Sequence, residues 1–288
     1  MTLSKRIGLD VGRATTTVYV RGEGVVVHEP SPGRTTGCRR EEVLQLIRRV
    51  QGFQRLFKPE VMICVSPQLS LGPRCELTEA AIEAGARQAW LIEEPLAAAI
   101  GAGLPVEEKA GMLVCDIGAG TTEIAALFGC STIATRTLAV GGSRLDEAIG
   151  AFLQHRVGCR LDREQAEQVK LAAGAAVPIE PVLKAVVGDR EVTSTELAAA
   201  VQPVLAIVAA GVAEVLEQAP KGVVERMRAR GLTLTGGGAQ LPGIDRFMWR
   251  HLGLPVRVAR DPQTCVARGA GQAPERLDVL RHGQGYFR

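Results

Sequence analysis

The feature that most constrains this chain is one short segment that occurs twice. Residues 7–20, "IGLDVGRATTTVYV", align without a gap with residues 113–126, "LVCDIGAGTTEIAA". In both copies an apolar run ends at an acid, passes through a turn of small residues and threonines, and becomes apolar again, as two strands around a turn would. A duplicated unit of this kind predicts an α/β chain of two similar domains, the second beginning near residue 109.

The two turns have the residue types of a nucleotide-phosphate site. Glycines let the backbone approach an anion and point successive N–H groups at it, while threonine hydroxyls add donors. The acids that precede the turns, Asp10 and Asp116, would repel a phosphate, so we expect them to hold Mg²⁺ through its water shell. Either turn alone could be a plain hairpin turn, but two copies and a third glycine turn favour the phosphate interpretation. The expected contacts are Gly12, Arg13, Ala14, Thr15, Gly118, Ala119, Gly120 and Thr121.

The third glycine turn, "TLTGGGAQLPGI", follows a strand pattern and precedes a helix pattern. Gly236, Gly237 and Gly238 would let an adenosine base lie flat on the backbone. Between the two repeats, "IEEPLAAAIG" places Glu94 at the end of a strand, from where a carboxylate can face a cleft and orient an attacking water. Glu93 and Glu94 could instead be acids that cap a helix N-terminus.

The composition is that of a globular chain without a nucleic-acid partner. A chain of 288 residues with 46% hydrophobic and 23% charged content can form two domains. Its net charge of +3 is too balanced to favour nucleic-acid binding, although it would suit a loose association with an anionic membrane. The seven scattered cysteines are expected to be reduced thiols. We expect neither a signal peptide nor an apolar run long enough to span a membrane, and hence a cytoplasmic protein.

These motifs together resemble the actin-like ATPase superfamily and, within it, the MreB-like bacterial actins. The resemblance runs from residue 6 to about residue 275 and includes "LIEEPLAAAIGAGLPVEE", "GGSRLDEAI", "AEQVK" and "DPQTCVARGAG". It implies an actin-like fold in which residues 1–108 with 263–288 and residues 109–262 form two domains that close on ATP and Mg²⁺. It also implies slow ATP hydrolysis, self-association into membrane-attached filaments, and partners among the proteins of cell-wall synthesis and cell shape.

The resemblance assigns roles to individual residues. Glu94 matches the acid that orients the hydrolytic water. Glu167 and Lys170 match the ribose and base contacts, whereas their spacing alone would indicate a surface ion pair on a helix. The other matches are the metal-side acids and residues close to the nucleotide: Asp10, Asp116, Gly118, Gly120, Thr121 and Gly142.

The chain departs from the family pattern in three places. Its first turn has Arg13 and Thr15 where the family has threonine and asparagine, and its second turn has Ala119 where the family has glycine. Alanine would be unfavourable there if the position required positive φ. After "HEPS" the chain runs almost directly into "EEVLQLI", so most of the first domain's small subdomain is missing, and the second is trimmed around "VVGDREV".

The shortening leaves other functions open, because those subdomains help to form filament contacts in the superfamily. A non-polymerising ATP-binding adaptor or regulator of the cell-wall machinery is one alternative, and a small-molecule kinase of the same superfold is another. The loop "GFQRLFKPE" bears on the choice. Leu56 and Phe57 could fold back onto the core, but the matching loop of the family inserts into the membrane, which implies a peripheral location at the inner face of the cell membrane.

Overall fold

The computed structural model of the chain describes residues 4–31, 39–51, 58–276 and 286–287. Its first sheet contains β1 (Arg6–Val11), β2 (Thr15–Val20), β3 (Gly24–Pro30), β4 (Glu60–Val65), β5 (Gln88–Glu93) and β13 (Tyr286–Phe287). Its second sheet contains β6 (Gly111–Ile117), β7 (Thr122–Phe128), β8 (Ser131–Leu138), β11 (Leu232–Thr235) and β12 (Val256–Val258). A separate hairpin is formed by β9 (Lys184–Val187) and β10 (Arg190–Thr193).

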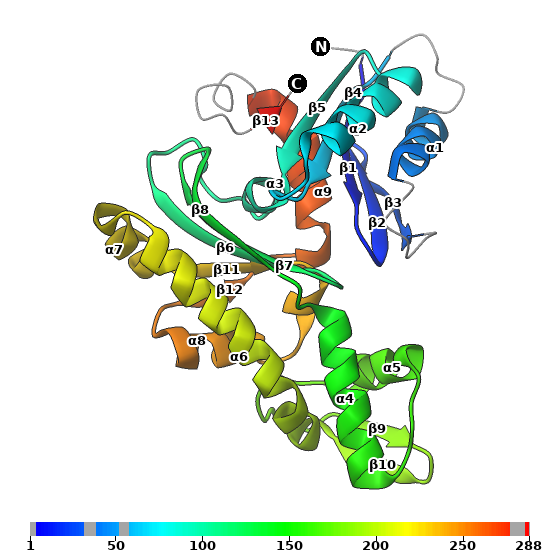
Figure 1. Cartoon of the computed structure of the whole chain (residues 1–288), viewed down its shortest axis with the longest axis vertical. Coiled ribbons are helices and arrows are strands. Elements are labelled where there is room, and N and C mark those ends of the chain that lie inside the picture. The colour runs from blue at the N-terminus through cyan, green and yellow to red at the C-terminus, as the bar shows by residue number, and fades with distance from the viewer. Residues whose placement is uncertain (1–3, 32–38, 52–57, 277–285, 288) are drawn as a thin grey trace.

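The α-helices connect and cover these sheets (Figure 1). They are α1 (Arg39–Gln51), α2 (Leu71–Glu83), α3 (Glu94–Gly101), α4 (Gly142–Val157), α5 (Arg163–Ala173), α6 (Ser194–Gln218), α7 (Lys221–Arg230), α8 (Ile244–Leu252) and α9 (Cys265–Gln272). Short 3₁₀ turns occur at Gly237–Gln240 (η1), Pro262–Thr264 (η2) and Ala273–Arg276 (η3).

The two sheets repeat one topology, as the duplicated sequence segment predicts. The first has the order β13-β5-β4-β1-β2-β3 and the second β12-β11-β6-β7-β8, so the orders coincide once β13 is set aside. In each sheet the first strand pairs antiparallel with the second and parallel with the fourth. The same turn closes each copy, since the N–H of Gly12 donates to the carbonyl of Thr15 at 3.1 Å and that of Gly118 to Thr121 at 2.9 Å.

Three hydrophobic cores stack the elements in five layers. One core lies between the first sheet and helices α1 and α2, and another joins the second sheet to α4, α6 and α8. Between them, α3 and α9 pack against both sheets in a third core that includes Met62 and Trp90 from the first sheet and Val114 from the second. Helices α3 and α9 form this central layer, seen between the two sheets in Figure 1.

Glycine allows α3 and α9 to approach each other closely. A methyl group at Gly269 would lie 1.8 Å from the carbonyl oxygen of Ala97, and one at Gly101 would lie 1.9 Å from that of Cys265. Real Cβ atoms do not approach backbone oxygens so closely, so both positions require glycine for this packing. The small-residue composition of both helices thus positions the two sheets relative to each other.

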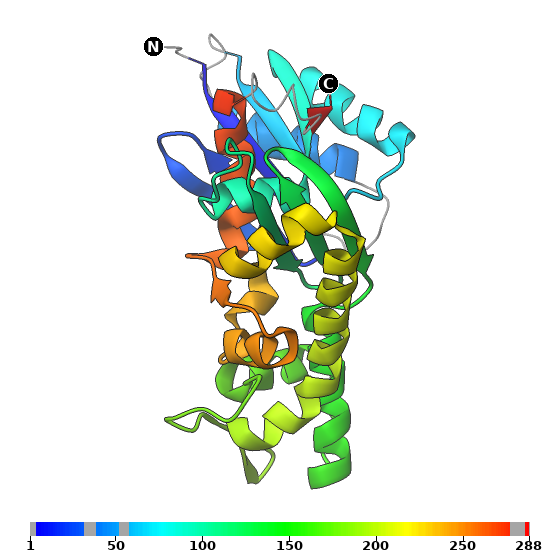
Figure 2. The ribbon, with the colours of Figure 1, turned by 90° about the vertical axis from the view of Figure 1, so that its left-hand side faces the viewer.

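The far end of the second half is a lobe of α4, α5, the β9–β10 hairpin and the start of α6, drawn at the bottom of both ribbon views (Figures 1 and 2). Residues 139–231 connect β8 to β11 through this lobe, whereas residues 31–59 connect the equivalent strands β3 and β4 with α1 as their described element. The two halves thus differ most in this connection.

Helix α6 contradicts the expectation that no run is long and apolar enough to cross a membrane. It has 25 residues and contains an 18-residue window with a mean hydropathy of 1.9, half of which is buried inside the structure. Leu197, Val201, Leu205 and Val212 of this helix belong to the core of the second half. Its apolarity is explained by this packing against β7, β8 and α8.

Three local elements are not indicated by a clear pattern in the sequence. The polar segment around Gly188 forms the β9–β10 hairpin, with Gly188 in the left-handed region at φ 64°. Residues 221–230 form α7, although their sequence has no apolar stripe that would predict a helix. Tyr286 and Phe287 form the short strand β13, which pairs antiparallel with β5. The six cysteines of the described residues are free, as expected.

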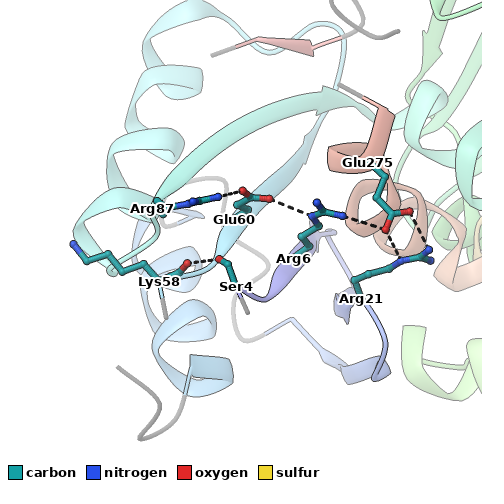
Figure 3. Close-up of polar contacts among 7 residues, drawn as sticks. All are labelled: Ser4, Arg6, Arg21, Lys58, Glu60, Arg87 and Glu275. Carbon is teal, nitrogen blue, oxygen red and sulfur yellow. Dashed lines mark hydrogen bonds and ion pairs between the residues drawn. The ribbon is translucent and has the colours of Figure 1, made fainter. Parts of the chain in front are cut away.

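A chain of ion pairs joins the start of the first sheet to the C-terminal segment (Figure 3). Glu60 at the start of β4 pairs with Arg87 and, at 3.2 Å, with Arg6 of β1. Arg6 also pairs with Glu275 of η3 at 3.1 Å, and Arg21 pairs with Glu275 at 2.9 Å. These contacts connect segments more than 200 residues apart in the sequence, so the C-terminal residues complete the first half of the molecule.

Candidate functional site

The second turn is held by the N-terminus of α4. The N–H groups of Gly142 and Ser143 donate to the carbonyls of Gly118 and Ala119 at 2.9 and 2.8 Å. Because C=O and N–H point in opposite directions across a trans peptide, the N–H groups of Ala119 and Gly120 point away from α4. Two adjacent donors directed out of a fixed turn are the arrangement expected of a phosphate-binding turn.

The alanine in this turn is accommodated without strain. Among the described residues, Asp261 is the non-glycine residue with positive φ, so Ala119 does not adopt the left-handed conformation. Gly118 and Gly120 also lack positive φ, so these glycines serve close approach instead. The departure at Ala119 therefore leaves the turn intact.

The first turn is tied to β3 and α1. The hydroxyl of Ser31 donates to the carbonyl of Gly12 at 2.7 Å, and that of Thr16 donates to Glu42 at 2.5 Å. Glu42 belongs to the first turn of α1, so this helix contacts β2 immediately after the first turn. Arg13 reaches the second turn: a methyl group at Gly120 would lie 2.8 Å from Nη1 of Arg13.

The two predicted metal-side acids and Glu94 converge on one buried thiol. Burial, and next the charges of Asp10, Glu94 and Asp116, raise the pKa of Cys64 well above its usual value. Asp116 is 8% exposed and accepts a hydrogen bond of 2.6 Å from Thr235. Burial raises the pKa of Asp116 to about 6, while the bond from Thr235 opposes this rise. Acids from both repeats and from the start of α3 therefore meet at one place.

Glu123 is a site residue that the sequence analysis missed. It lies on β7 directly opposite Asp116, is 2% exposed, and its Oε2 has no hydrogen-bond partner among the described residues. Burial, and then the charge of Glu94, raise the pKa of Glu123 to about 9. One signal was present: the repeat aligns Glu123 with Thr17, so an acid replaces a neutral residue at an inward strand position.

The third glycine turn packs against the second. Gly236 has φ 82°, and a methyl group there would lie 2.4 Å from the carbonyl oxygen of Ile117, next to Gly118. A methyl group at Gly238 would lie 2.3 Å from Cγ2 of Ile117, whereas one at Gly237 would contact nothing within 4 Å. Two glycines thus allow the close approach, and the third leaves open space beside it.

Lys170 and Gly142 also lie together. Nζ of Lys170 forms an ion pair with Asp146 of α4 at 2.6 Å and approaches the carbonyl oxygen of Gly142 at 3.4 Å. Glu167 lies one turn earlier on α5, with an oxygen 4.0 Å from the same Nζ. The surface-pair interpretation of Glu167 and Lys170 thus holds in part, but Lys170 is 14% exposed and faces the N-terminal half of α4.

The membrane loop and the metal site remain predictions. Leu56 and Phe57 lie outside the described residues. Within the described ranges, no group of three or more His, Cys, Asp or Glu side chains is placed to hold a metal ion by itself. A pair of acids that contacts Mg²⁺ through water does not require such a group.

The chain is similar in sequence to bacterial cell-shape proteins. The profile of the family described as "MreB/Mbl protein" matches residues 38–282. The "Cell shape-determining protein MreB" of Escherichia coli (strain K12) is 35% identical over 338 residues, covering 99% of this chain and 96% of that protein. That alignment is longer than the 288 residues of this chain, so the relative contains segments that the chain lacks. The "Cell shape-determining protein Mbl" of Bacillus subtilis (strain 168) is 27% identical over 96% of the chain and 98% of the relative.

Solved structures share the fold. MreB5 of Spiroplasma citri bound to ADP has a TM-score of 0.86 and 24% identity, covering 99% of this chain and 100% of that one. A MamK double helical filament has a TM-score of 0.77 and 18% identity, covering 93% and 98%. The duplicated sheets thus form the predicted actin-like ATPase fold. With this fold and its match to the family profile over most of its length, the chain belongs to the MreB/Mbl family of bacterial actin-like proteins.

Proposed function

We propose that this protein binds ATP and Mg²⁺ between its two halves and assembles into membrane-associated filaments that guide cell-wall synthesis and cell shape. The observation that carries the nucleotide proposal is the convergence of the second glycine turn, the third glycine turn, Arg13 of the first turn, and the acids around Cys64. These groups come from both repeats, and together they supply phosphate donors and carboxylates. The ADP-bound state of MreB5 supports this proposal.

The residues present fit a magnesium ion held through water. Asp10 and Asp116 provide carboxylate oxygens, the ligand type that Mg²⁺ prefers, and Mg²⁺ usually retains several waters. The ion would neutralise developing charge on the phosphates. Glu94 at the start of α3 would orient the attacking water, and Glu123, neutral at pH 7, adds no further negative charge beside it.

The remaining contacts would hold the nucleoside. Gly236, Gly237 and Gly238 would receive the base, and Glu167 and Lys170 the ribose. Residues 1–108 with 263–288 would act as the first domain, consistent with the packing of α9 on β1, and residues 109–262 as the second.

The filament proposal rests on family membership. Relatives are named cell shape-determining proteins, and MamK forms a double helical filament. A soluble, non-polymerising adaptor is the second candidate. The observation that favours it is the short connection from β3 to β4, because most of the first small subdomain, a source of filament contacts, is absent.

Sedimentation and light scattering with Mg-ATP test the filament proposal. We expect ATP-dependent growth of scattering above a critical concentration, since head-to-tail contacts generate open polymers. An Asp116→Ala variant, which would not bind Mg-ATP, is the control and should remain in the supernatant. A parent that binds Mg-ATP but never sediments would support the adaptor.

A further inference from the structure

We propose that Arg13 determines how strongly the site prefers a nucleoside triphosphate over a nucleoside diphosphate. Its guanidinium, carried by the first turn, would bind the terminal phosphates of a nucleotide against the second turn. This inference rests on the proposed nucleotide site, and it names the residue that makes the site prefer triphosphate over diphosphate.

The side chain of Arg13 crosses from one repeat to the other. Arg13 lies between β1 and β2, and Gly120 between β6 and β7. A methyl group at Gly120 would lie 2.8 Å from Nη1, 3.0 Å from Cδ and 3.2 Å from Cζ of Arg13, so the guanidinium rests on the place a side chain would occupy. Glycine at position 120 thus leaves room for the Arg13 side chain beside the second turn.

Donors from both repeats meet at this contact. The carbonyls of Gly118 and Ala119 are used by α4, which leaves the N–H groups of Ala119 and Gly120 directed away from that helix. The guanidinium adds further donors beside them, and Arg13 as a whole is an exposed residue. A guanidinium presents a planar fork that matches the oxygens of a phosphate in two parallel hydrogen bonds.

A cationic side chain at this place would complement the negative charge of the phosphates. The carboxylates of Asp10, Glu94 and Asp116 all act electrostatically on Cys64, and the phosphates of a nucleotide would bring further negative charge to the site. The nearby Lys170 is paired with Asp146, and Arg163 donates to the hydroxyl of Ser143. Within residues 4–31, 39–51 and 58–276, no carboxylate forms an ion pair with Arg13.

The first turn carries a basic side chain, and the second turn does not. The repeat aligns Arg13 with Ala119 and Ala14 with Gly120. The first turn thus supplies the long charged side chain, and the second turn supplies the small residues against which it rests. This asymmetry within a duplicated unit indicates a specialised role for Arg13 rather than a feature of the turn itself.

Calorimetric titration of the full chain with Mg-ATP, Mg-ADP and adenosine tests the inference. Arg13→Ala should weaken Mg-ATP binding by roughly 10- to 100-fold, the range for loss of hydrogen bonds to a charged group. Binding of Mg-ADP should weaken less, and binding of adenosine should not change. Arg13→Lys keeps the charge but loses the fork, and should fall between parent and alanine variant.

A second route displaces Arg13 without removing it. The methyl group in Gly120→Ala would push the guanidinium away, so this variant should also weaken Mg-ATP more than adenosine. Arg13→Ala and Gly120→Ala disrupt the same interaction. The double variant should therefore bind Mg-ATP with about the same affinity as whichever single variant binds it more weakly. Arg228→Ala on α7 removes one exposed arginine elsewhere and should leave all three affinities unchanged.

The outcomes separate this inference from the proposed function. An Arg13→Ala protein that binds Mg-ATP as tightly as the parent, or more tightly, would overturn the role of Arg13. The nucleotide site itself would still stand if Asp116→Ala abolishes the Mg²⁺ dependence of binding. Equal weakening for ATP, ADP and adenosine would also overturn it, since the phosphates would then not be the ligand. A parent that binds neither Mg-ATP nor adenosine would overturn the nucleotide site itself and Arg13 with it.

Discussion

The hydroxyl of Thr235 donates a hydrogen bond of 2.6 Å to Oδ1 of Asp116 and joins the third glycine turn to the second repeat. The bond stabilises the ionised form of a buried carboxylate whose pKa is about 6. Mg²⁺ binding requires that ionised form, so this one contact connects the packing of β11 beside β6 to the chemistry of the site.

Thr235→Val should therefore weaken Mg-ATP binding more at pH 6.5 than at pH 8. Loss of the donor raises the pKa of Asp116 further, so a larger fraction of the carboxyl is protonated at the lower pH. Titrations at both pH values measure the effect. Thr233→Val, the same change on the same strand at a residue that accepts a bond from Arg257, is the control. Equal losses at both pH values would show that Thr235 does not act through Asp116.

Asp116→Ala should abolish metal-dependent nucleotide binding. The variant removes a carboxylate that we expect to hold Mg²⁺ through water. Calorimetry with ATP in the presence of Mg²⁺ or of a chelator measures the difference. Unchanged Mg-ATP affinity in the variant would show that the metal lies elsewhere.

Glu94→Ala should lower ATP turnover by roughly 10² or more, the scale of a positioned acid–base group, with affinity nearly unchanged. Phosphate release at saturating ATP, measured together with the dissociation constant, separates the two effects. Glu93→Ala is the matched control variant. Glu93 is the adjacent acid, and its carboxylate accepts a hydrogen bond of 3.1 Å from the hydroxyl of Thr132. A Glu94→Ala protein that hydrolyses ATP at the parent rate would exclude this role.

Glu123→Gln should stabilise the ligand-free protein, and more so at pH 8 than at pH 5. The pKa of Glu123 is raised from 4.5 to about 9, chiefly by burial and then by Glu94, with Asp116 and Glu93 adding to the rise and Ser66 opposing it. The folded state therefore keeps a proton that the unfolded state releases, and stability falls as pH rises through this window. Glutamine does not titrate, so the gain at pH 8 should reach at least about 1 kcal/mol.

Thermal unfolding at the two pH values measures this gain. Glu76→Gln on the exposed side of α2 is the control and should show no such pH-dependent difference. A Glu123→Gln protein whose advantage is the same at pH 5 and pH 8 would mean that Glu123 ionises normally in the folded protein.

The two carboxylates of the ion-pair chain in Figure 3 should differ in their contribution to stability. Glu60 is 12% exposed and contacts Arg6 and Arg87, so Glu60→Gln should lower the free energy of unfolding by about 2 to 3 kcal/mol. Glu275 is 35% exposed, and Glu275→Gln should lower it by no more than about 1 kcal/mol. Urea unfolding of both variants measures the difference, and a larger effect at Glu275 would contradict the ranking by burial.

Leu56→Ser/Phe57→Ser should reduce liposome binding without changing nucleotide binding. Two apolar side chains in lipid contribute only about 3 to 5 kcal/mol, so a monomer would bind weakly and binding would depend on many copies in a filament. Co-sedimentation with anionic liposomes, with and without ATP, measures this. Equal pelleting of parent and variant, or of neither, would count against a membrane-bound filament and favour the adaptor.

The amino-acid sequence by itself determined the duplicated strand–turn–strand unit, both predicted metal-side acids, Glu94 and the three glycine turns. Each depends on short-range patterns: apolar runs that end at an acid, glycines between strand and helix, and an acid before Pro95. The short helix α7 and the β9–β10 hairpin were missed because their stability comes from packing against the second half rather than from local periodicity.

Only the tertiary structure decided which distant residues meet. Arg13 and Gly120, Thr235 and Asp116, and Glu123 and Glu94 come from separate elements, and no local pattern specifies the direction in which such side chains point. The raised pKa of Glu123 and the tolerance of Ala119 likewise follow from burial and from the backbone conformation of a packed turn. The sequence thus determined which chemical groups are available, and the stacking of two sheets about α3 and α9 decided which of them share one site, because burial and charge act through space.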